Sequence, residues 1–263
     1  MKKIISMILA VLMLASLSLT VSANSDGNNW GDIPMFKGEI KLDGEKDDIY
    51  DMGFTVDIKN RTDGKTGGAT GLAYMLWGNN KFYVFVEVKD ADIVKLDPAR
   101  STWQNEGVEF TFDFGNAGAN RCKTTVTMED SKSSVSGDAT EKMFTVKCKQ
   151  TSTGYNAEII CDLSAQNIQA AKAGAKYGIN LLINDMTGKD TRGIIRTVHK
   201  NNPTENENKK FDYITLSGDE VELAVEEKAP AAATKAPATA DLGTIAVIAL
   251  ISAGGVVVSK KRR

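Results

Sequence analysis

Residues 81–88 read KFYVFVEV, a run of β-branched and aromatic side chains that is typical of a buried β-strand. The tripeptide Gly78-Asn79-Asn80 precedes this run, and its residue types are characteristic of tight turns. Ahead of the turn, residues 71–77 read GLAYMLW and form a second apolar run. The two runs and their turn together predict a β-hairpin.

The remaining pattern is also that of strands. Residues 108–114 alternate, with phenylalanines on one face and Glu109 on the other. One short helix is expected over residues 165–173, with Ser164 as its N-cap and Gly174 at its end. Further strands are expected at residues 144–148, 155–161, 179–183 and 213–216. These elements predict an all-β fold, an antiparallel β-sandwich of the immunoglobulin-like or jelly-roll-like kind with one short helix.

The two ends of the chain have the composition of targeting segments. Two lysines precede the apolar run at residues 4–21, and Val21-Ser22-Ala23 offers the small residues that a signal peptidase reads. We therefore expect a signal peptide at residues 1–23, with an uncleaved membrane helix as the alternative. Residues 242–258 carry no charge and are followed by a basic tail, which predicts a C-terminal membrane span within residues 241–263.

Between these ends we expect one folded domain and a spacer. Residues 224–240 are rich in Ala, Pro, Lys and Glu and lack aromatic side chains, so they are interpreted as an extended spacer. Residues 24–223 then form the β domain. The order Pro237-Ala238-Thr239, apolar span and basic tail resembles a Gram-positive sortase signal, although Ala236 and Ala240 depart from the usual pattern. Attachment to the cell wall by sortase and a plain membrane anchor both place the domain outside the cell, on its surface.

Charge and cysteine content narrow the function further. The formal net charge is −2 with both signs interspersed, which argues against a nucleic-acid partner. A single histidine, His199, and no Cys-x-x-Cys spacing exclude a zinc site. In the expected hairpin Cys148 faces Ala157 and Cys161 faces Phe144. This register leaves Cys122–Cys148 as the pair compatible with a disulfide, and three buried free thiols are the alternative.

A set of short segments, taken in order, resembles the family 9 carbohydrate-binding module, within the wider group of DOMON-like sandwiches. The resemblance covers residues 38–216. It is carried by residues 40–44 with Asp47, Asp48 and Tyr50, and by residues 76–90, 103–113, 154–158, 178–180, 184–185, Gly188 and Arg192.

The resemblance implies a non-catalytic domain that binds a poly- or oligosaccharide, clamping a terminal glucose or xylose unit between two tryptophans. Trp103 matches the first tryptophan, Glu109 matches a carboxylate that accepts sugar hydroxyls, and Asn201 matches a hydrogen-bonding asparagine. Pro203 and Thr204 stand where the second tryptophan is expected. An expected basic residue and an expected glutamine also depart from the pattern, falling at Thr125 and Leu182.

The resemblance also implies structural calcium held by acids at one end of the sandwich. Asp43, Asp90 and Asp185 are the predicted ligands, with Asp47 and Asp48 as further candidates.

Each aromatic or acidic candidate also has an ordinary structural interpretation. Trp77 lies in the most apolar stretch of the chain and is expected in the core, whereas Trp103 lies in a polar loop. Glu109 could simply belong to a solvated strand face. Stacking on one indole and a few hydrogen bonds predict affinities from millimolar to high micromolar.

Two other functions are compatible with the sequence. The chain could be an accessory part of a glycoside-hydrolysing system, because modules of this family are commonly fused to glycosidases. A glycosidase itself needs two carboxyl groups in a cleft, and no second domain remains to house one. The third possibility is a haem-binding DOMON domain that uses His199 and Met75 as axial ligands.

Overall fold

A computed structural model of residues 1–263 describes residues 29–61, 67–113, 121–131, 133–137, 140–165, 171–186, 192–196 and 211–223. The chain divides into two compact units, Met1–Ala224 and Val225–Arg263, and every described residue belongs to the first. The all-β fold class is confirmed.

Thirteen strands account for most of the described residues. They are β1 (Asn29–Met35), β2 (Phe54–Ile58), β3 (Asn60–Arg61), β4 (Thr70–Gly78), β5 (Lys81–Lys89), β6 (Gly107–Asp113), β7 (Arg121–Thr127), β8 (Ser133–Gly137), β9 (Phe144–Gln150), β10 (Gly154–Asp162), β11 (Lys176–Met186), β12 (Arg192–Arg196) and β13 (Tyr213–Glu220). Helical structure within the described ranges is limited to 3-10 turns, η2 (Asp48–Met52), η3 (Thr102–Gln104), η4 (Glu141–Met143) and η5 (Leu163–Ala165).

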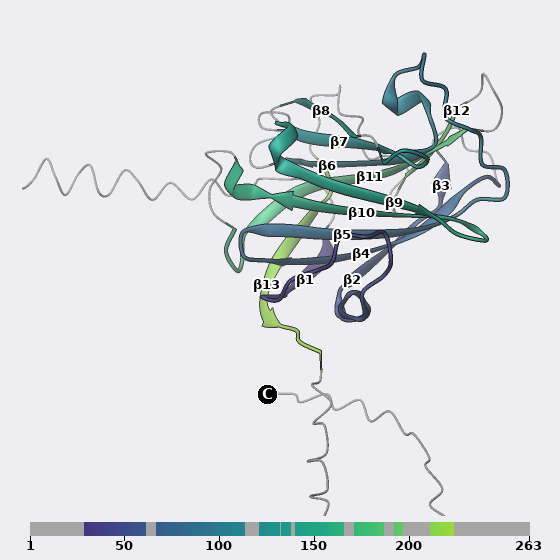
Figure 1. Cartoon of the computed structure of the whole chain (residues 1–263). Helices are drawn as coiled ribbons and strands as arrows, with labels where there is room; N and C mark the ends of the chain where they lie inside the picture. The colour runs from purple at the N-terminus through teal and green to yellow at the C-terminus, as the bar shows by residue number, and fades with distance from the viewer. Residues whose placement is uncertain are drawn as a thin grey trace, which may run out of the picture. The chain divides into compact units, whose positions relative to one another are not determined.

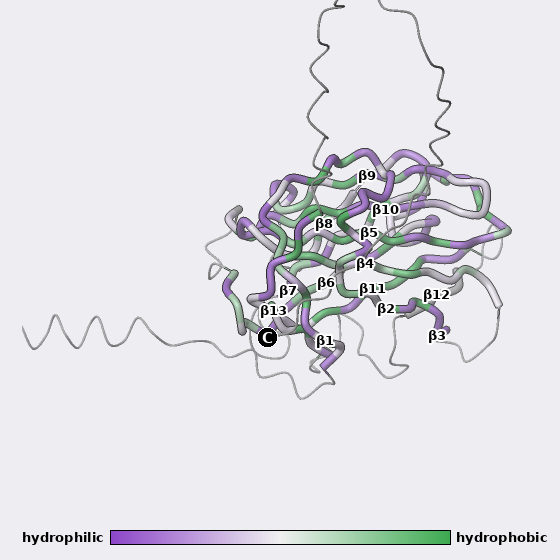
Figure 2. The backbone as a smooth tube through the Cα atoms, turned by 90° about the horizontal axis from the view of Figure 1, so that it is seen from below, coloured by the Kyte–Doolittle hydropathy of each residue, from purple (hydrophilic) through white to green (hydrophobic). Residues whose placement is uncertain are grey.

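The strands form one continuous sheet that folds over into two layers. Its order is β8-β7-β6-β11-β13-β1-β4-β5-β10-β9, with β12 beside β11 and β2 beside β4. β4, β5, β10 and β9 make the layer nearer the viewer in Figure 1, and β7, β6 and β11 make the layer behind it, as the view from below in Figure 2 also shows. Most pairings are antiparallel, but β1 runs parallel to both β13 and β4 where the sheet turns over.

The main core fills the space between the two layers. Phe82 of β5 meets Phe112 of β6 with ring centroids 6.0 Å apart. The Tyr155 hydroxyl on β10 donates a hydrogen bond to the Gly107 carbonyl oxygen on β6, at 3.1 Å. Trp77 lies in this core with 4 % exposure, as the sequence predicted. The alternation of large apolar side chains along the strands of both layers therefore stabilises the sandwich.

The β4–β5 hairpin shows why its turn carries two asparagines. Asn79 and Asn80 have φ values of 49° and 59°, and asparagine tolerates this left-handed backbone better than most residues do. Gly78 has no room for a side chain, since a Cβ there would lie 1.8 Å from the Phe36 carbonyl oxygen. The predicted hairpin is confirmed, with β4 and β5 paired from Thr70 opposite Lys89 to Gly78 opposite Lys81.

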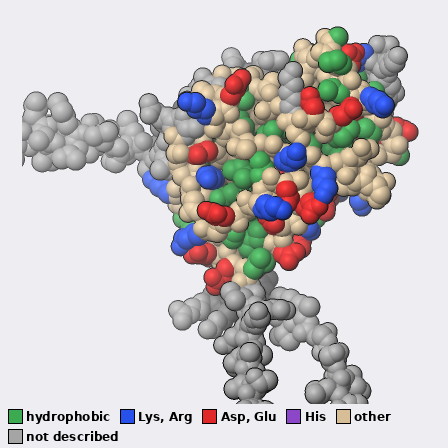
Figure 3. Space-filling view, viewed as in Figure 1, with side chains coloured by type: hydrophobic (Ala, Val, Ile, Leu, Met, Phe, Trp, Pro, Cys, Tyr) green, Lys and Arg blue, Asp and Glu red, His purple; other side chains and the backbone are tan. Residues whose placement is uncertain are grey.

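A smaller apolar cluster lies on the outer face of β4 and β5, under the segment that joins β1 to β2. Glu158 of β10 anchors this segment because its carboxylate accepts hydrogen bonds from the Tyr50 hydroxyl and from the backbone N–H groups of Asp43 and Gly44, each at 3.1 Å. The cluster consists of Ile49, Tyr50, Tyr74, Leu76, Tyr83 and Phe85. Figure 3 shows the face of this layer, where basic and acidic side chains are interspersed as the sequence indicated.

The three cysteines are free and buried, so of the two alternatives the structure has thiols. The predicted register is confirmed, with Cys148 opposite Ala157 and Cys161 opposite Phe144. Burial raises the pKa of the Cys148 thiol to about 12, which makes it a poor nucleophile at neutral pH.

Several terminal and helical predictions fall outside the described residues. The signal peptide, the spacer, the span at residues 242–258 and the sortase-like motif all do so. The middle of the helix expected at residues 165–173 is also outside them, and its described C-terminal part, residues 171–173, is not helical. No helix in the described ranges is long and apolar enough to cross a bilayer.

Candidate functional site

The outer side of β7, β6 and β11 carries polar side chains where the opposite side carries the core, and most of these polar side chains are buried. Because side chains alternate along a strand, Phe110 points into the sandwich and Glu109 points away from it. We call this outer surface the polar face. Its members are Glu109 and Thr111 of β6, Lys123, Thr125 and Thr127 of β7, and Asn180, Leu182 and Asn184 of β11.

Glu109 lies at the centre of the polar face and has partners on both neighbouring strands. Lys123 Nζ lies 3.3 Å from Glu109 Oε2, and Asn184 Nδ2 donates to Glu109 Oε1 at 3.0 Å. Glu109 is only 2 % exposed, so its interpretation as part of a solvated strand face is wrong. A buried carboxylate needs such partners, because an unpaired charge is expensive to desolvate.

The structure corrects the position of the basic residue on β7. Thr125 stands directly opposite Glu109 in the ladder, but it carries no charge. The positive charge comes from Lys123, two residues earlier and therefore on the same face. Because every second side chain of β7 lies on the same face, the sequence pattern could have identified Lys123 as the basic residue. Leu182 stands opposite Glu109 on β11, where the family resemblance implies a glutamine. Leucine has no amide group, and the amide of Asn184 donates to Glu109 instead.

Trp103 lies on the 3-10 turn η3, next to two of the strands that carry this face. The turn contacts β7 and β11, and the Trp103 side chain is 43 % exposed, which is unusual for a large apolar residue in this domain. Ser101 and Gln104 frame it with reciprocal side-chain-to-backbone contacts that form a capping box. Trp103 is thus an indole held on an ordered turn with part of its surface open to solvent, which suits stacking against a sugar ring.

The third predicted sugar contact and one of the two haem-ligand candidates fall outside the described residues. Asn201 lies outside the described residues, as do Pro203, Thr204 and His199. Met75, considered as a haem ligand, is 1 % exposed in the core between the layers.

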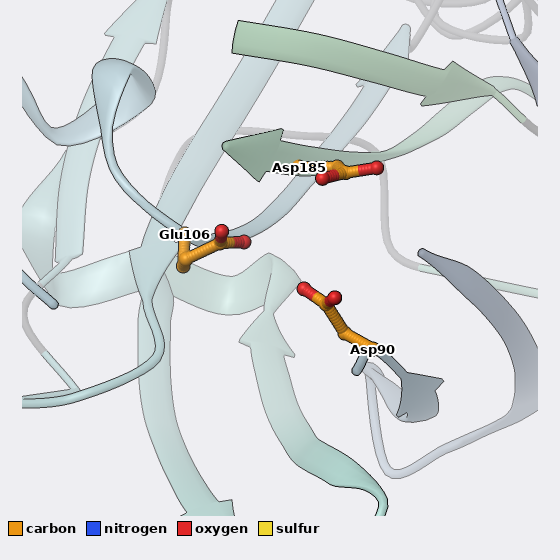
Figure 4. Close-up of side chains that lie close together, drawn as sticks. All are labelled: Asp90, Glu106 and Asp185. Carbon is orange, nitrogen blue, oxygen red and sulfur yellow. The ribbon is translucent and has the colours of Figure 1, made fainter. Parts of the chain in front are cut away.

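A second group of side chains gathers at one end of the sandwich. Asp90 follows β5, Glu106 precedes β6 and Asp185 lies near the end of β11. One carboxylate oxygen of each lies within 4.8 Å of the others, and all three residues are buried. Figure 4 shows the three carboxylates directed toward a common space. We call this group the acid cluster.

Two carboxylate oxygens of the acid cluster have no hydrogen-bond partner among the described residues. Asp90 Oδ2 and Glu106 Oε2 are buried without a hydrogen-bond partner. Asp185 Oδ2 accepts a hydrogen bond from the Ala69 backbone N–H at 2.8 Å, and Arg61 Nη1 lies 3.8 Å from it. Burial, reinforced by the charge of Asp90, raises the pKa of Glu106 to about 8. Buried, unpaired carboxylate oxygens that face one another are a donor set that fits a hard divalent cation.

The sequence predicted two members of this cluster and missed the third. Asp43 does not belong to it, because the Asp43 carboxylate pairs with Lys41 at 2.7 Å and its backbone N–H binds Glu158. Glu106 takes the third place. Glu106 lies two residues before Val108, and residues two apart on a strand point to the same face. Because Val108 points into the core, the strand period could have indicated that Glu106 also points inward.

Comparison with known proteins agrees with this architecture. A model of the family described as "Carbohydrate family 9 binding domain-like" matches residues 42–219, and the chain belongs to this family. No curated protein matches the sequence.

Two solved structures share the fold. One is a family 9 carbohydrate-binding module from Caldicellulosiruptor kristjanssonii in complex with cellotriose, with a TM-score of 0.61, 20 % identity, and coverage of 71 % of this chain and 94 % of that chain. The other is such a module from the same organism in complex with glucose, with a TM-score of 0.61, 20 % identity, and coverage of 73 % and 98 %. At this identity the likeness shows the fold.

Proposed function

We propose that this domain binds carbohydrate without catalysing a reaction, and that the ligand is an oligosaccharide or polysaccharide of glucose units. The observation that carries the proposal is the open indole of Trp103 on a turn that contacts β7 and β11, the two strands that flank Glu109. Membership of the family and the cellotriose and glucose complexes of two structural neighbours support it.

The roles follow from the chemistry of each group. Trp103 supplies an apolar surface for the C–H groups of a pyranose ring. The Glu109 carboxylate is held in orientation by Lys123 and Asn184, and because it is only 2 % exposed it would accept hydrogen bonds from sugar hydroxyls only where the sugar displaces what covers it. Asn201 is proposed as a further hydrogen-bonding residue. With one tryptophan in place of a clamp of two, we expect dissociation constants from millimolar to high micromolar.

A glycan array probed with the purified protein tests the proposal. Glucose-terminated oligosaccharides, cellotriose among them, should give signal on the array, and Trp103→Ala should remove it. Absence of binding to every glycan, with the protein shown to be folded by circular dichroism, would contradict it. Many copies on one surface can make such weak sites effective through multivalency.

We also propose that the acid cluster holds a divalent cation, with calcium as the best fit. Asp90, Glu106 and Asp185 would be its side-chain ligands, and the cation would supply the positive charge that balances three buried carboxylates. A cation bound only by the folded state raises the melting temperature by mass action. Calcium added to chelator-treated protein should therefore raise it, and the triple variant Asp90→Asn/Glu106→Gln/Asp185→Asn should not respond.

For location, we propose export and display at the cell surface, with the domain carried on the spacer at residues 224–240. Residues 1–23 and the cassette from Pro237 to Arg263 support this reading. Cell fractionation tests it: intact protein that still bears Met1 in the cytosol would contradict it. Sortase attachment predicts that wall-released protein ends at Thr239.

A further inference from the structure

The acid cluster and the Trp103 turn are parts of one loop. The loop joins β5 to β6, Asp90 stands at its start and Glu106 at its end, and Trp103 lies three residues before Glu106. Glu106 Oε1 also accepts a hydrogen bond from the Met186 backbone N–H at 2.9 Å and a longer one from Val94 N–H at 3.4 Å. Glu106 therefore joins the two sides of the loop to the end of β11.

The part of the loop that carries Trp103 is organised around one buried amide. Asn105 is 4 % exposed. Its Oδ1 accepts the Asp97 backbone N–H at 2.8 Å, while its Nδ2 donates to the carbonyl oxygens of Asp97 at 3.3 Å and Ser101 at 3.2 Å. Asn105 thus connects both sides of the turn that presents Trp103, and its chain neighbour on the other side is the cluster residue Glu106.

The two sites also share strand ends. Strand alternation sends Glu106 and Asp185 inward to the acid cluster, and sends Glu109 and Asn184 outward to the polar face. Asn184 pairs with Gly107 in the β11–β6 ladder, so the backbone under both sites is continuous. A cation that draws the three carboxylates together would therefore act on side chains attached to the loop ends and to the end of β11.

Electrostatic repulsion links the shape of the loop to cation binding. Without a cation, the Asp90 and Asp185 carboxylates repel each other across the cluster, and Asp90 and Glu106 each have an oxygen without a hydrogen-bond partner. Repulsion between like charges at such short range favours a more open loop. A cation removes the repulsion and favours the closed loop, which holds Trp103 beside the polar face.

We propose that cation binding at the acid cluster controls carbohydrate affinity by positioning Trp103, and that Asn105 is the positioning residue that links the two sites. This inference rests on the proposed functions of both sites. Because coupling between two binding sites is reciprocal, the sugar should strengthen cation binding by the same factor as the cation strengthens sugar binding.

The test is isothermal titration calorimetry of cellotriose into the purified protein, in calcium and in EDTA, with melting curves recorded in both buffers. We expect calcium to lower the dissociation constant for cellotriose at least about fivefold, a size typical of coupled sites. Asn105→Ala should keep the calcium-dependent rise in melting temperature and lose the calcium dependence of cellotriose binding. Asn156→Ala is the matched control, because its amide makes a comparable bond to the Gly44 carbonyl oxygen at 3.1 Å, outside both sites.

The outcomes separate the proposals. Equal cellotriose affinity in both buffers, with a melting temperature that responds to calcium, overturns the coupling and leaves the proposed functions intact. A melting temperature that ignores calcium overturns the cation site and the coupling with it. No cellotriose binding in either buffer overturns the proposed carbohydrate ligand. If Asn105→Ala does not fold, the comparison of the two buffers with the unmodified protein still decides the coupling.

Discussion

Removing the Trp103 indole should weaken carbohydrate binding about thirtyfold while leaving the domain folded. A tryptophan side chain has about 250 Å² of surface, and 43 % exposure leaves roughly 110 Å² of it open. A pyranose stacked on one face of the ring would cover about 80 Å². At about 25 cal/mol/Å² this burial contributes about 2 kcal/mol, or about a thirtyfold change in the dissociation constant.

The stability cost of Trp103→Ala should be smaller, about 1–2 kcal/mol, because only part of the indole is buried and its contacts lie within a surface loop. Trp77→Ala is the matched control. Trp77 is 4 % exposed, its Nε1 donates to the Ser217 carbonyl oxygen at 2.9 Å, and its loss should cost about 3–5 kcal/mol of unfolding free energy as a core cavity.

Calorimetric titration with cellotriose and urea denaturation measure the two effects on the same samples. The account predicts that Trp103→Ala loses binding with a small change in unfolding free energy, and that Trp77→Ala shows the reverse wherever it folds. The reasoning is refuted if Trp103→Ala binds cellotriose as tightly as the unmodified protein does, or if it unfolds the domain.

Three further predictions concern buried charges. Lys123→Met should lower the unfolding free energy by about 3 kcal/mol, because it leaves the buried Glu109 carboxylate without its basic partner. Urea denaturation should show that the double variant Lys123→Met/Glu109→Leu recovers most of this loss. Additive losses in the two single variants and the double variant would argue against the pair. Burial raises the pKa of Glu158 from 4.5 to about 7, so the folded state favours the protonated acid. The unfolding free energy should therefore fall by up to about 3 kcal/mol as pH rises from 4.5 to above 7. Glu158→Gln should lose that pH dependence, and an unchanged profile would contradict the assignment. Chelator should lower the melting temperature of the unmodified protein, and a curve that does not move would remove the proposed cation.

The strand framework could be predicted from sequence because the sandwich is built from strong local patterns. The apolar runs before and after Gly78 each correspond to a strand of the structure, and so does the described part of the next alternating segment, residues 108–113. The register of Cys148 opposite Ala157 was also predictable, since a short turn fixes the pairing of the strands beside it. The parallel pairing of β1 was not, because it joins segments far apart in the chain and no local pattern specifies it.

The candidate sites were only partly predictable for a related reason. Glu109 was correctly placed on the face opposite the phenylalanines, but its burial and its pairing with Lys123 depend on β7 and β11. Asp90 and Asp185 meet at the end of the sandwich, whereas Asp43 lies elsewhere because Glu158 anchors its segment to β10. Strand alternation says which way a side chain points, and only the strand order says which side chains meet.

The most direct test of the central claim observes the three tryptophan indoles. Trp30 Nε1 donates to Asp212 Oδ2 at 3.1 Å and Trp77 Nε1 donates to the Ser217 carbonyl oxygen, so both have partners in the protein. Nitrogen-15 NMR of the labelled protein, with each indole signal assigned by a Trp→Phe variant, follows all three during titration with cellotriose. The account predicts that the Trp103 indole signal shifts in a saturable way while those of Trp30 and Trp77 stay in place. A saturable shift confined to Trp30 or Trp77, or no shift at millimolar cellotriose, would contradict it.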